Sequence, residues 1–273
     1  MSWLRPWRYR KRRQIACIEL RGPITASTRT AVLKLLKRVE TCQFPALLLR
    51  IDSPGGTVGD SQEIHQALVR LQQRHGCHVV ASYGNISASG GVYVGVAAKE
   101  VVANPGTITG SIGVILRGSN ISELLQRLGV RFETVKSGPY KDILSPDRSL
   151  SDAERQLLQD LIDSSFHQFV EAVAQGRGLD PEAVKTFADG RVFTGAQAKA
   201  LGLVDHLGDE DLARRRAATL AGLDPDKARL VKLEDRPKGL RRLLPASGLL
   251  SRLGRELELE LLHGSGPLWL YRP

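Results

Sequence analysis

ALLLRIDSPGG, residues 46–56, joins a short apolar run, ALLLRID at 46–52, to a turn rich in glycine. A leucine-rich run of this length is typical of a strand buried on both faces of a sheet, and the glycines mark a loop at its end. Two further runs, HVVASY at 78–83 and EVVA at 100–103, predict more buried strands. Residues 25–41 repeat their apolar positions near every 3.6 residues and predict a helix, and a second helix is expected over 59–74. Strands that alternate with helices predict an α/β fold with a largely parallel sheet.

The pattern continues on both sides of these segments. QIACIE at 15–20 predicts a first strand, residues 119–128 predict a third helix, and RFETVKS at 131–137 predicts another strand. From 151 to about 222 the chain is mostly of helical character, and we expect this part to flank the sheet or to form a contact between subunits.

The chain is expected to have three parts. A basic segment covers residues 1–14, the main domain covers 15–222 with its helical part from about 151, and a C-terminal extension covers 223–273. In the extension, leucines at helical spacing favour an amphipathic helix within 240–262, and GSGPLWLYRP at 264–273 predicts an extended tail.

The formal net charge of +10 is concentrated near the two ends. Residues 1–13 and residues 236–255 each carry six basic side chains and no acidic one. The rest of the chain is therefore slightly acidic, which argues against a nucleic-acid partner, because such a domain carries its basic stripe on the folded body. Two interpretations of the ends stay open: contact with an anionic membrane, at about 1 kcal/mol per basic residue near the lipid, and solvated tails.

Targeting signals and special chemistry are expected to be absent. No run approaches the roughly 18 apolar residues of a spanning helix, and the start lacks the apolar region of a secretory signal. The expected location is peripheral to the cell membrane on the cytoplasmic side, with the cytoplasm as the alternative. Three scattered cysteines fit a reducing compartment better than a disulfide framework. We expect neither a cofactor nor a metal.

Three glycine-bearing turns follow apolar strands: SPGG (53–56), SASGG (87–91) and TGSIG (109–113). None matches the dinucleotide fingerprint, and no Walker pattern occurs. Each turn has two interpretations. It is a simple tight turn, or it brings backbone N–H groups close to a ligand, as an oxyanion hole does.

Ser89, in SASGG, precedes a predicted helix of small residues. The serine is either an N-cap or a nucleophile whose small neighbours leave its hydroxyl facing a cleft. No histidine follows a comparable turn, so a base would have to be a lysine, as in known Ser–Lys pairs. A lysine acting as a base near neutral pH needs a pKa roughly three units below its usual value, about 4 kcal/mol, which burial supplies. KSGPYKD offers both Lys136 and Lys141, and local chemistry alone does not choose between them.

Taken together, the motifs resemble the signal peptide peptidase A family of serine peptidases in its short, single-repeat form. The resemblance covers roughly residues 15–215. It implies a Clp-protease/crotonase type of α/β fold, a spiral of strand-strand-helix repeats, and a ring of identical subunits. The matching stretches, in the family's order, are IDSPGG (51–56), SASGGVYV (87–94), NPGTITGSIGV (104–114), VKSGPYKDILSP (135–146) and GRVFTGAQAKALGLVDHLG (190–208).

The resemblance also implies a role for five residues. Ser89 corresponds to the family's nucleophile and Lys141 to its general base, in preference to Lys136. Ser111, in TGSIG, corresponds to the serine whose hydroxyl orients that lysine. Gly56 and Gly90 correspond to the positions whose N–H groups form the oxyanion hole. The implied reaction is hydrolysis of peptide bonds through an acyl-enzyme, with remnant signal peptides or other apolar peptides as substrates.

This sequence departs from the family's usual pattern in two places. Many members have an N-terminal membrane anchor, where this chain has a basic start containing Trp3 and Trp7. GGVYV also replaces a more aromatic GGYY, which bears on the substrate pocket rather than on the Ser–Lys pair.

Two other functions compete with the peptidase. A crotonase-like enzyme acting on acyl-CoA thioesters would share the fold and the oxyanion hole, but would not need the Ser89–Lys141 pair. A non-catalytic scaffold at a membrane surface would use only the basic ends. A separate hypothesis is that residues 264–273 enter the substrate channel as a product-like plug, and the alternative is that they pack on a neighbouring subunit.

Overall fold

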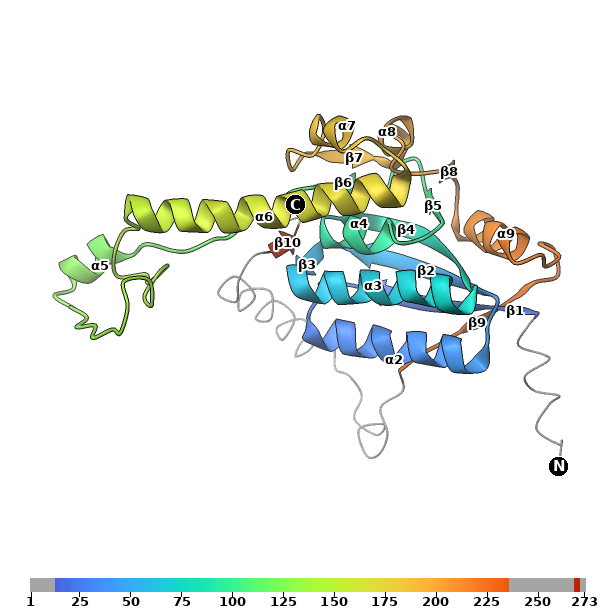
Figure 1. Ribbon diagram of the computed structural model, residues 1–273, viewed down its shortest axis with the longest axis horizontal. Helices are drawn as coiled ribbons and strands as arrows, with labels where there is room; N and C mark the ends of the chain where they lie inside the picture. The colour runs from blue at the N-terminus through green and yellow to red at the C-terminus, as the bar shows by residue number, and fades with distance from the viewer. Residues whose placement is uncertain (1–12, 236–267, 271–273) are drawn as a thin grey trace, which may run out of the picture.

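Within the part of the chain that the structure describes, an eight-stranded sheet forms the centre of the molecule (Figure 1). This structure is a computed structural model, and it describes residues 13–235 and 268–270. The strand order is β7-β6-β4-β2-β1-β9, with β5 pairing with both β4 and β8, and every pair is parallel except β6 with β7. The strands are β1 (Gln14–Arg21), β2 (Ala46–Ser53), β4 (His78–Ala88), β5 (Glu100–Ala103), β6 (Ile108–Gly110), β7 (Val192–Thr194), β8 (His206–Leu207) and β9 (Arg229–Lys232).

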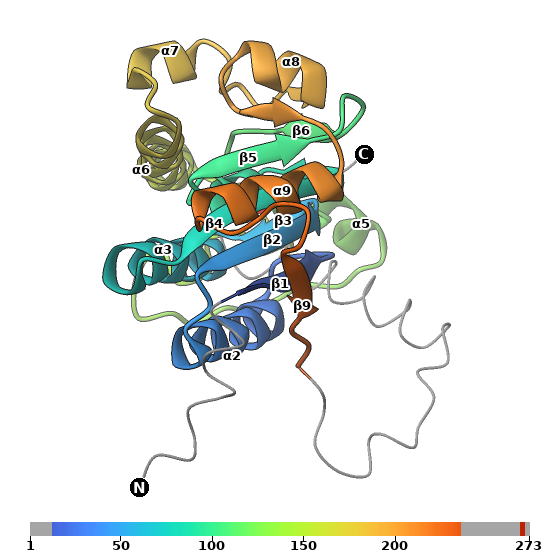
Figure 2. The same cartoon turned by 90° about the vertical axis from the view of Figure 1, so that its right-hand side faces the viewer.

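Helices cover both faces of this sheet (Figure 2). α2 (Ala26–Cys42) and α3 (Val58–His75) lie side by side on one face, and α9 (Glu210–Leu220) packs on the other. β2 contributes to both cores, since Leu47 and Leu49 belong to the larger one and Leu48 to the smaller one. This double burial is the reason for the continuous apolar run from which the strand was predicted.

β4 divides the sheet into two levels. Its residues 80–83 pair with β5, whereas its residues 86–88 pair with β6. Between these halves the register against β2 shifts, and Asp52 stabilises the irregularity by accepting a hydrogen bond from the Ile86 amide (3.1 Å). Only glycine fits at Gly84, because a Cβ there would lie 2.7 Å from Cγ of Asp52. Such an irregularity re-aims the end of a strand, and the end of β4 carries the serine considered below.

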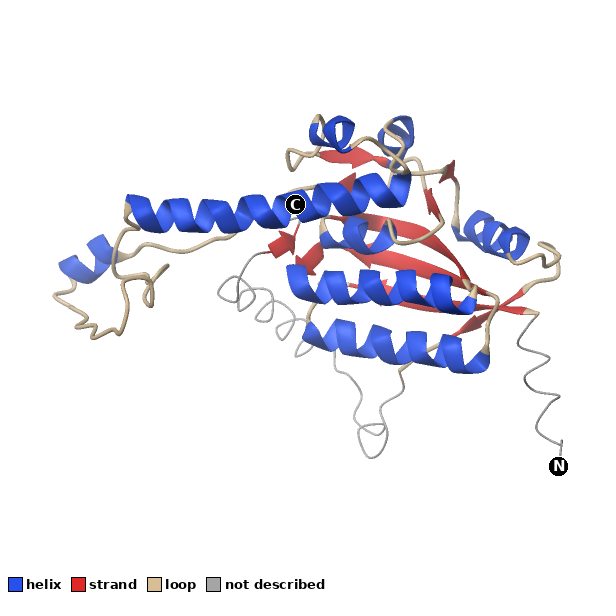
Figure 3. Ribbon diagram, viewed as in Figure 1, coloured by secondary structure: helices blue, strands red, loops and turns tan. Residues whose placement is uncertain are grey.

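α6 (Asp152–Arg177) links the body to a projecting arm (Figure 3). Its 26 residues span about 39 Å at 1.5 Å per residue. The C-terminal half packs on the body so closely that a Cβ at Gly176 would lie 2.2 Å from the carbonyl oxygen of Val96. The N-terminal half extends beyond the sheet beside α5 (Ser122–Arg127) and the loop after it. We call residues 115–161 the arm.

Apolar side chains of the arm are exposed. Of the twelve large hydrophobic side chains that are exposed in the described residues, ten belong to the arm. The arm therefore presents an apolar surface that the described residues do not cover. These ten are Ile115, Ile121, Leu124, Leu128, Val130, Phe132, Val135, Tyr140, Leu157 and Leu161.

Most predicted elements are present, and one is wrong. Residues 131–137 form no strand: they lie on the arm with exposed side chains, and no described strand lies beside them to complete a ladder. The helix predicted over 119–128 is the shorter α5, and the helical region after 151 is divided into α6, α7 (Pro181–Lys185), α8 (Gly195–Ala200) and α9.

Some expectations fall on other parts of the chain. Residues 1–12 and the predicted helix within 240–262 lie outside the described residues. Among the helices that the structure describes, none combines the length and the apolar character needed to cross a membrane.

Candidate active site

Ser89 lies at the turn between β4 and the short helix α4 (Gly90–Gly95). Its backbone has φ 52° and ψ −116°, a conformation that costs a non-glycine residue about 1–3 kcal/mol. Its amide donates to the Gly110 carbonyl (2.8 Å), and its carbonyl accepts from the Tyr93 amide (3.0 Å). The hydroxyl makes no capping hydrogen bond to α4, so the N-cap interpretation does not explain this serine. A strained serine between strand and helix, whose hydroxyl makes no hydrogen bond to the described residues, is the arrangement expected of a nucleophile, and in the single chain this residue is only 1% exposed.

Ser111 stands next to Ser89 at the edge of the sheet. β4 and β6 are parallel and in register, with Ala88 opposite Gly110, and each serine follows directly on one of these residues. Neighbouring strands are about 4.8 Å apart, which puts the two serines side by side. Ser111 also has a positive φ, 51°, and its amide donates to the Arg191 carbonyl (2.7 Å). The structure thus brings together two of the predicted site residues from motifs that are distant in sequence.

The SPGG turn forms the opposite wall of the site. After β2, the Ser53 hydroxyl accepts the Gly55 amide (3.1 Å) and starts the short strand β3 (Gly55–Thr57). A Cβ at Gly91 would lie 3.1 Å from the Ser53 carbonyl oxygen, so the SPGG and SASGG turns are in close contact. Gly90, as the first residue of α4, has an amide without a partner inside the helix, as every first-turn residue does.

Gly56 is fixed by a backbone contact on one edge of β3. The Ile24 amide donates to the Gly55 carbonyl (2.8 Å), and the Thr57 amide donates to the Ile24 carbonyl (3.0 Å). Because successive residues of a strand direct their backbone groups to opposite edges, the Gly56 N–H and C=O face the other edge. A Cβ at Gly56 would lie 2.0 Å from the Ile24 carbonyl oxygen, so this position requires glycine.

The C-terminal strand β10 (Leu268–Leu270) lies along that second edge (Figure 1). It pairs with β3 in antiparallel orientation, with Trp269 opposite Gly56 and Leu268 opposite Thr57. α4 contacts both β3 and β10. The tail of the chain therefore occupies the backbone edge at which the Gly56 N–H is directed.

Lys141 is not brought to Ser89 within one chain. It lies in the loop of the arm, with an exposed side chain for which no hydrogen bond or ion pair is found among the described residues. The neighbouring Asp142 is tied to Glu154 in the first turn of α6 through Arg148. From there α6 runs about 22 Å at 1.5 Å per residue before Phe169 contacts Tyr93 of α4, with ring centroids 5.3 Å apart. The loop of Lys141 is thus attached to α6 about 22 Å along the helix from the residue that contacts α4.

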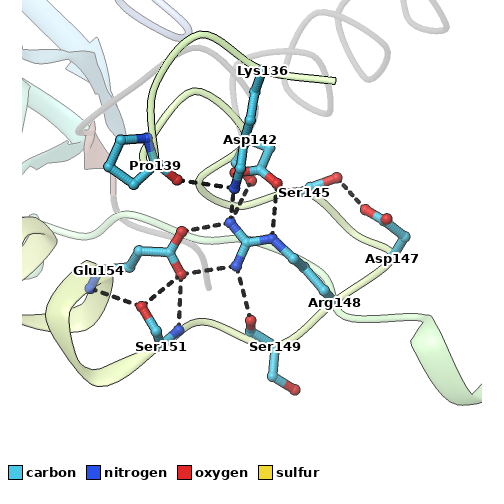
Figure 4. A network of polar contacts seen from close by, with 9 residues as sticks. All are labelled: Lys136, Pro139, Asp142, Ser145, Asp147, Arg148, Ser149, Ser151 and Glu154. Carbon is cyan, nitrogen blue, oxygen red and sulfur yellow. Dashed lines mark hydrogen bonds and ion pairs between the residues drawn. The ribbon is translucent and has the colours of Figure 1, made fainter. Parts of the chain in front are cut away.

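Lys136 is engaged by its own loop. Its ammonium group donates to Asp142 Oδ1 (2.6 Å) and to the Pro139 carbonyl (3.1 Å), as Figure 4 shows. A lysine whose ammonium group is engaged by these two oxygens is not free to reach a serine, which disfavours a role as base. This contact distinguishes Lys136 from Lys141, which the local sequence alone leaves as equal candidates for the base.

One histidine lies close to the site but contacts Tyr93 rather than Ser89. His65, on α3, has its Nδ1 2.8 Å from the Tyr93 carbonyl oxygen, and its ring centroid is 4.9 Å from that of Tyr93. Burial lowers the pKa of His65, so the imidazole is neutral and its Nδ1–H donates to the carbonyl. It supports the turn of α4 that follows Ser89.

Comparison with known proteins agrees with this arrangement. The profile of peptidase family S49 matches residues 72–224. The chain is 55% identical to the Synechocystis sp. protein named "Putative protease slr0021", and the match covers the whole of both chains. The chain belongs to peptidase family S49. It is also 40% identical over 175 residues to a protein of Enterococcus faecium named as a signal peptide peptidase, covering 64% of this chain and 51% of that protein.

Solved structures share the fold of this S49 peptidase. A structure of the 1510-N membrane-bound stomatin-specific protease superposes with a TM-score of 0.56 at 16% identity, covering 82% of this chain and 98% of the other. A structure of ClpP1 from Listeria monocytogenes gives 0.51 at 16% identity, covering 72% and 93%. The predicted family, the Clp-protease-like fold and the serine peptidase activity are confirmed. The assignment to a peptidase family favours peptide hydrolysis over the acyl-CoA and scaffold alternatives.

The sequence did not reveal two features of the site. One is the strand on which the tail lies, since the plug hypothesis for residues 264–273 did not name β3 as its partner, and the other is the set of ion pairs around Arg148 in the arm. The second left only a weak signal, since Lys136, Asp142, Arg148 and Glu154 alternate in sign at intervals of six residues. No regular element repeats at that interval, so the pattern has no structural meaning before the fold of the loop is known.

Proposed function

We propose that this S49 peptidase cleaves peptide bonds with Ser89 as nucleophile and with Lys141 supplied as general base by a second copy of the chain. The observation that carries the proposal is the strained backbone of Ser89, which lies beside Ser111 and whose hydroxyl makes no hydrogen bond to the described residues. Ser111 is proposed to orient the incoming lysine. The N–H groups of Gly56 and Gly90 are proposed to bind the oxyanion.

The reaction proceeds by acyl transfer. The neutral amine of Lys141 takes the proton of the Ser89 hydroxyl as its oxygen attacks the carbonyl carbon of the peptide. The C–N bond then breaks, and the leaving amine receives that proton from the lysine. A water molecule, deprotonated by the same lysine, attacks the ester and releases the acid, while the proton returns to the Ser89 oxygen.

A second copy provides what one chain lacks. The loop of Lys141 is tied to α6 about 22 Å along the helix from its contact with α4, and the exposed apolar side chains of the arm favour contact with another subunit. In a closed ring of identical subunits, the arm of each subunit would reach the body of the next, so every active site would receive a lysine in the same way.

The substrate is proposed to bind as an added strand on β3. β10 occupies this edge as an antiparallel strand, so the same edge fits an extended peptide with its main chain opposite Gly56. Apolar peptides, including remnant signal peptides, are the proposed class, in line with the Enterococcus faecium relative named as a signal peptide peptidase.

Peripheral membrane contact on the cytoplasmic side is part of the same proposal. The two basic segments, residues 1–13 and 236–255, carry twelve positive charges and no acidic residue, and each charge near an anionic surface contributes about 1 kcal/mol. The structural neighbour described as a membrane-bound stomatin-specific protease is consistent with this location. Sedimentation with vesicles containing anionic lipid, compared with neutral vesicles, tests it.

Peptide cleavage by single variants tests the catalytic proposal. Ser89→Ala and Lys141→Ala should each abolish cleavage of an apolar fluorogenic peptide without changing the circular dichroism spectrum. Lys185→Ala is the matched control, because Lys185 is another exposed lysine, and among the described residues it pairs with Glu182 of the same helix, α7. Full activity of Lys141→Ala would refute the assigned base, and full activity of Ser89→Ala would refute the nucleophile.

A further inference from the structure

The loop that carries Lys141 has no regular structure of its own. Residues 128–151 contain neither helix nor strand, and most of their side chains are exposed. A cavity of about 360 Å³ lies between this loop and α6, lined among others by Leu116, Leu144, Leu158 and Ile162. Apolar packing therefore joins the loop to the helix only in part, and polar contacts must contribute to its position.

Those contacts converge on the residue next to the lysine. The carboxylate of Asp142 accepts hydrogen bonds from Arg148 through Nε (3.0 Å) and Nη2 (2.8 Å), and from Lys136 through Nζ (2.6 Å), as Figure 4 shows. Arg148 Nη2 also donates to the Asp142 backbone carbonyl (3.2 Å). A bidentate guanidinium–carboxylate pair fixes orientation as well as distance. Asp142 is thus held at both its side chain and its backbone, one bond away from Lys141.

The other side of Arg148 is anchored in α6. Its Nη1 donates to Glu154 Oε2 (2.8 Å), and the Glu154 residue is only 3% exposed. Glu154 is the third residue of the helix and forms a capping box with Ser151, whose amide donates to the same carboxylate (2.8 Å). This anchor is rigid, because a capping box ties the side chain to the helix end.

The two negative and two positive side chains of this network balance in charge. Asp142 and Glu154 are opposed by Arg148 and Lys136, and the hydrogen bonds of Arg148 hold the pKa of both carboxyl groups below its usual range. The pairs therefore stay ionised at neutral pH. α6 in turn reaches the body at Phe169 and Gly176. A continuous series of directional contacts thus runs from the body through α6 and Arg148 to the residue beside Lys141.

We propose that Arg148 is a positioning residue for the general base: by bridging Glu154 of α6 to Asp142, it sets the place and direction in which the arm presents Lys141 to the neighbouring active site. The inference rests on the proposed role of Lys141. Catalysis by a lysine requires it to stand within hydrogen-bond reach of the serine, and a displacement of about 1 Å costs on the order of 10²-fold in rate. Arg148 itself touches neither substrate nor Ser89.

The test separates positioning from folding. Arg148→Gln should lower kcat by about 10- to 100-fold with KM, subunit assembly and the circular dichroism spectrum unchanged, because the edge of β3 and the apolar surface of the arm remain. Arg148→Lys, which keeps the charge but cannot bridge both carboxylates in the same geometry, should give an intermediate kcat. Arg215→Gln is the matched control, since Arg215 also pairs with two carboxylates, Asp211 and Asp226, but lies on α9. It should keep the wild-type kcat.

The outcomes are distinct. An Arg148→Gln enzyme with wild-type kcat overturns the inference, as does one whose loss of kcat is matched by loss of assembly, which would show only that the arm no longer folds. Lys141→Ala, measured beside it, reports on the proposed function. If Lys141→Ala is inactive while Arg148→Gln is unimpaired, only the positioning role fails. If Lys141→Ala is fully active, the proposed function fails first.

Discussion

Mixing two inactive variants shows whether the active site is shared between subunits. Ser89→Ala keeps a functional lysine and Lys141→Ala keeps a functional serine, so each alone should be inactive. If the arm of one subunit serves the serine of the next, a site regains activity when a Lys141→Ala copy supplies the serine and a Ser89→Ala copy supplies the lysine. When the two variants are present in equal amounts and in random order in a symmetric ring, about half of the sites have an intact serine. The neighbouring subunit supplies an intact lysine to about half of these, so about a quarter of all sites are complete.

The structure explains why this recovery needs two copies. About 22 Å of α6, at 1.5 Å per residue, separates Glu154, to which the lysine loop is tied, from Phe169, which contacts α4. The assay is co-expression of the two variants with different affinity tags, purification through both tags, and cleavage of a fluorogenic peptide. Co-expression of Ser89→Ala with a chain carrying both substitutions is the control and should stay inactive. No recovery in assembled mixed rings would refute the shared site.

Three further predictions follow from single contacts. Ending the chain at Leu262 removes β10 from the edge of β3, so kcat/KM for a short peptide should rise. The rise should be about tenfold if the tail is bound nine-tenths of the time. An unchanged kcat/KM would mean that the tail does not compete with substrate. Gly56→Ala should abolish cleavage and lower the unfolding temperature, because a Cβ would lie 2.0 Å from the carbonyl oxygen of Ile24; a stable, active variant would contradict the placement of β3. The lowered pKa values of Asp142 and Glu154 mean that their ion pairs stabilise the fold above about pH 4 and are lost as the pH falls below it. The free energy of urea unfolding should therefore fall more steeply from about pH 5 to pH 2 in the wild type than in Asp142→Asn, and equal slopes would contradict this.

The centre of the fold is readable from the sequence because its strands are apolar runs bounded by turns. The strand predicted at 100–103 is β5 residue for residue, and the one predicted at 46–52 is β2 to within one residue. The strand predicted at 131–137 is wrong for a different reason: the segment contains residue types that are common in strands, Phe132, Thr134 and Val135, but the chain places it on the arm, away from any described strand. A strand needs a neighbour, and sequence periodicity does not supply one. The division into domains stays a prediction.

The site is only partly readable. Local chemistry makes Ser89 a candidate, yet its proximity to Ser111 depends on the pairing of β4 with β6, and β6 has only three residues and no periodic signal. The choice of Lys141 over Lys136 came from the resemblance to a family. The structure adds a physical reason, the ion pair between Lys136 and Asp142. The proposed pairing of Ser89 with Lys141 is not visible within one chain, because Lys141 lies on the arm, which projects beyond the sheet.

The central claim, that Ser89 is the nucleophile activated by Lys141, is tested most directly by covalent labelling. The assembled wild-type enzyme is treated with a serine-reactive fluorophosphonate, digested, and analysed by mass spectrometry. The account predicts a single adduct on Ser89 that forms at a much lower rate in Lys141→Ala and at the wild-type rate in Lys185→Ala. An adduct on another serine, or an undiminished rate on Ser89 in Lys141→Ala, would contradict it.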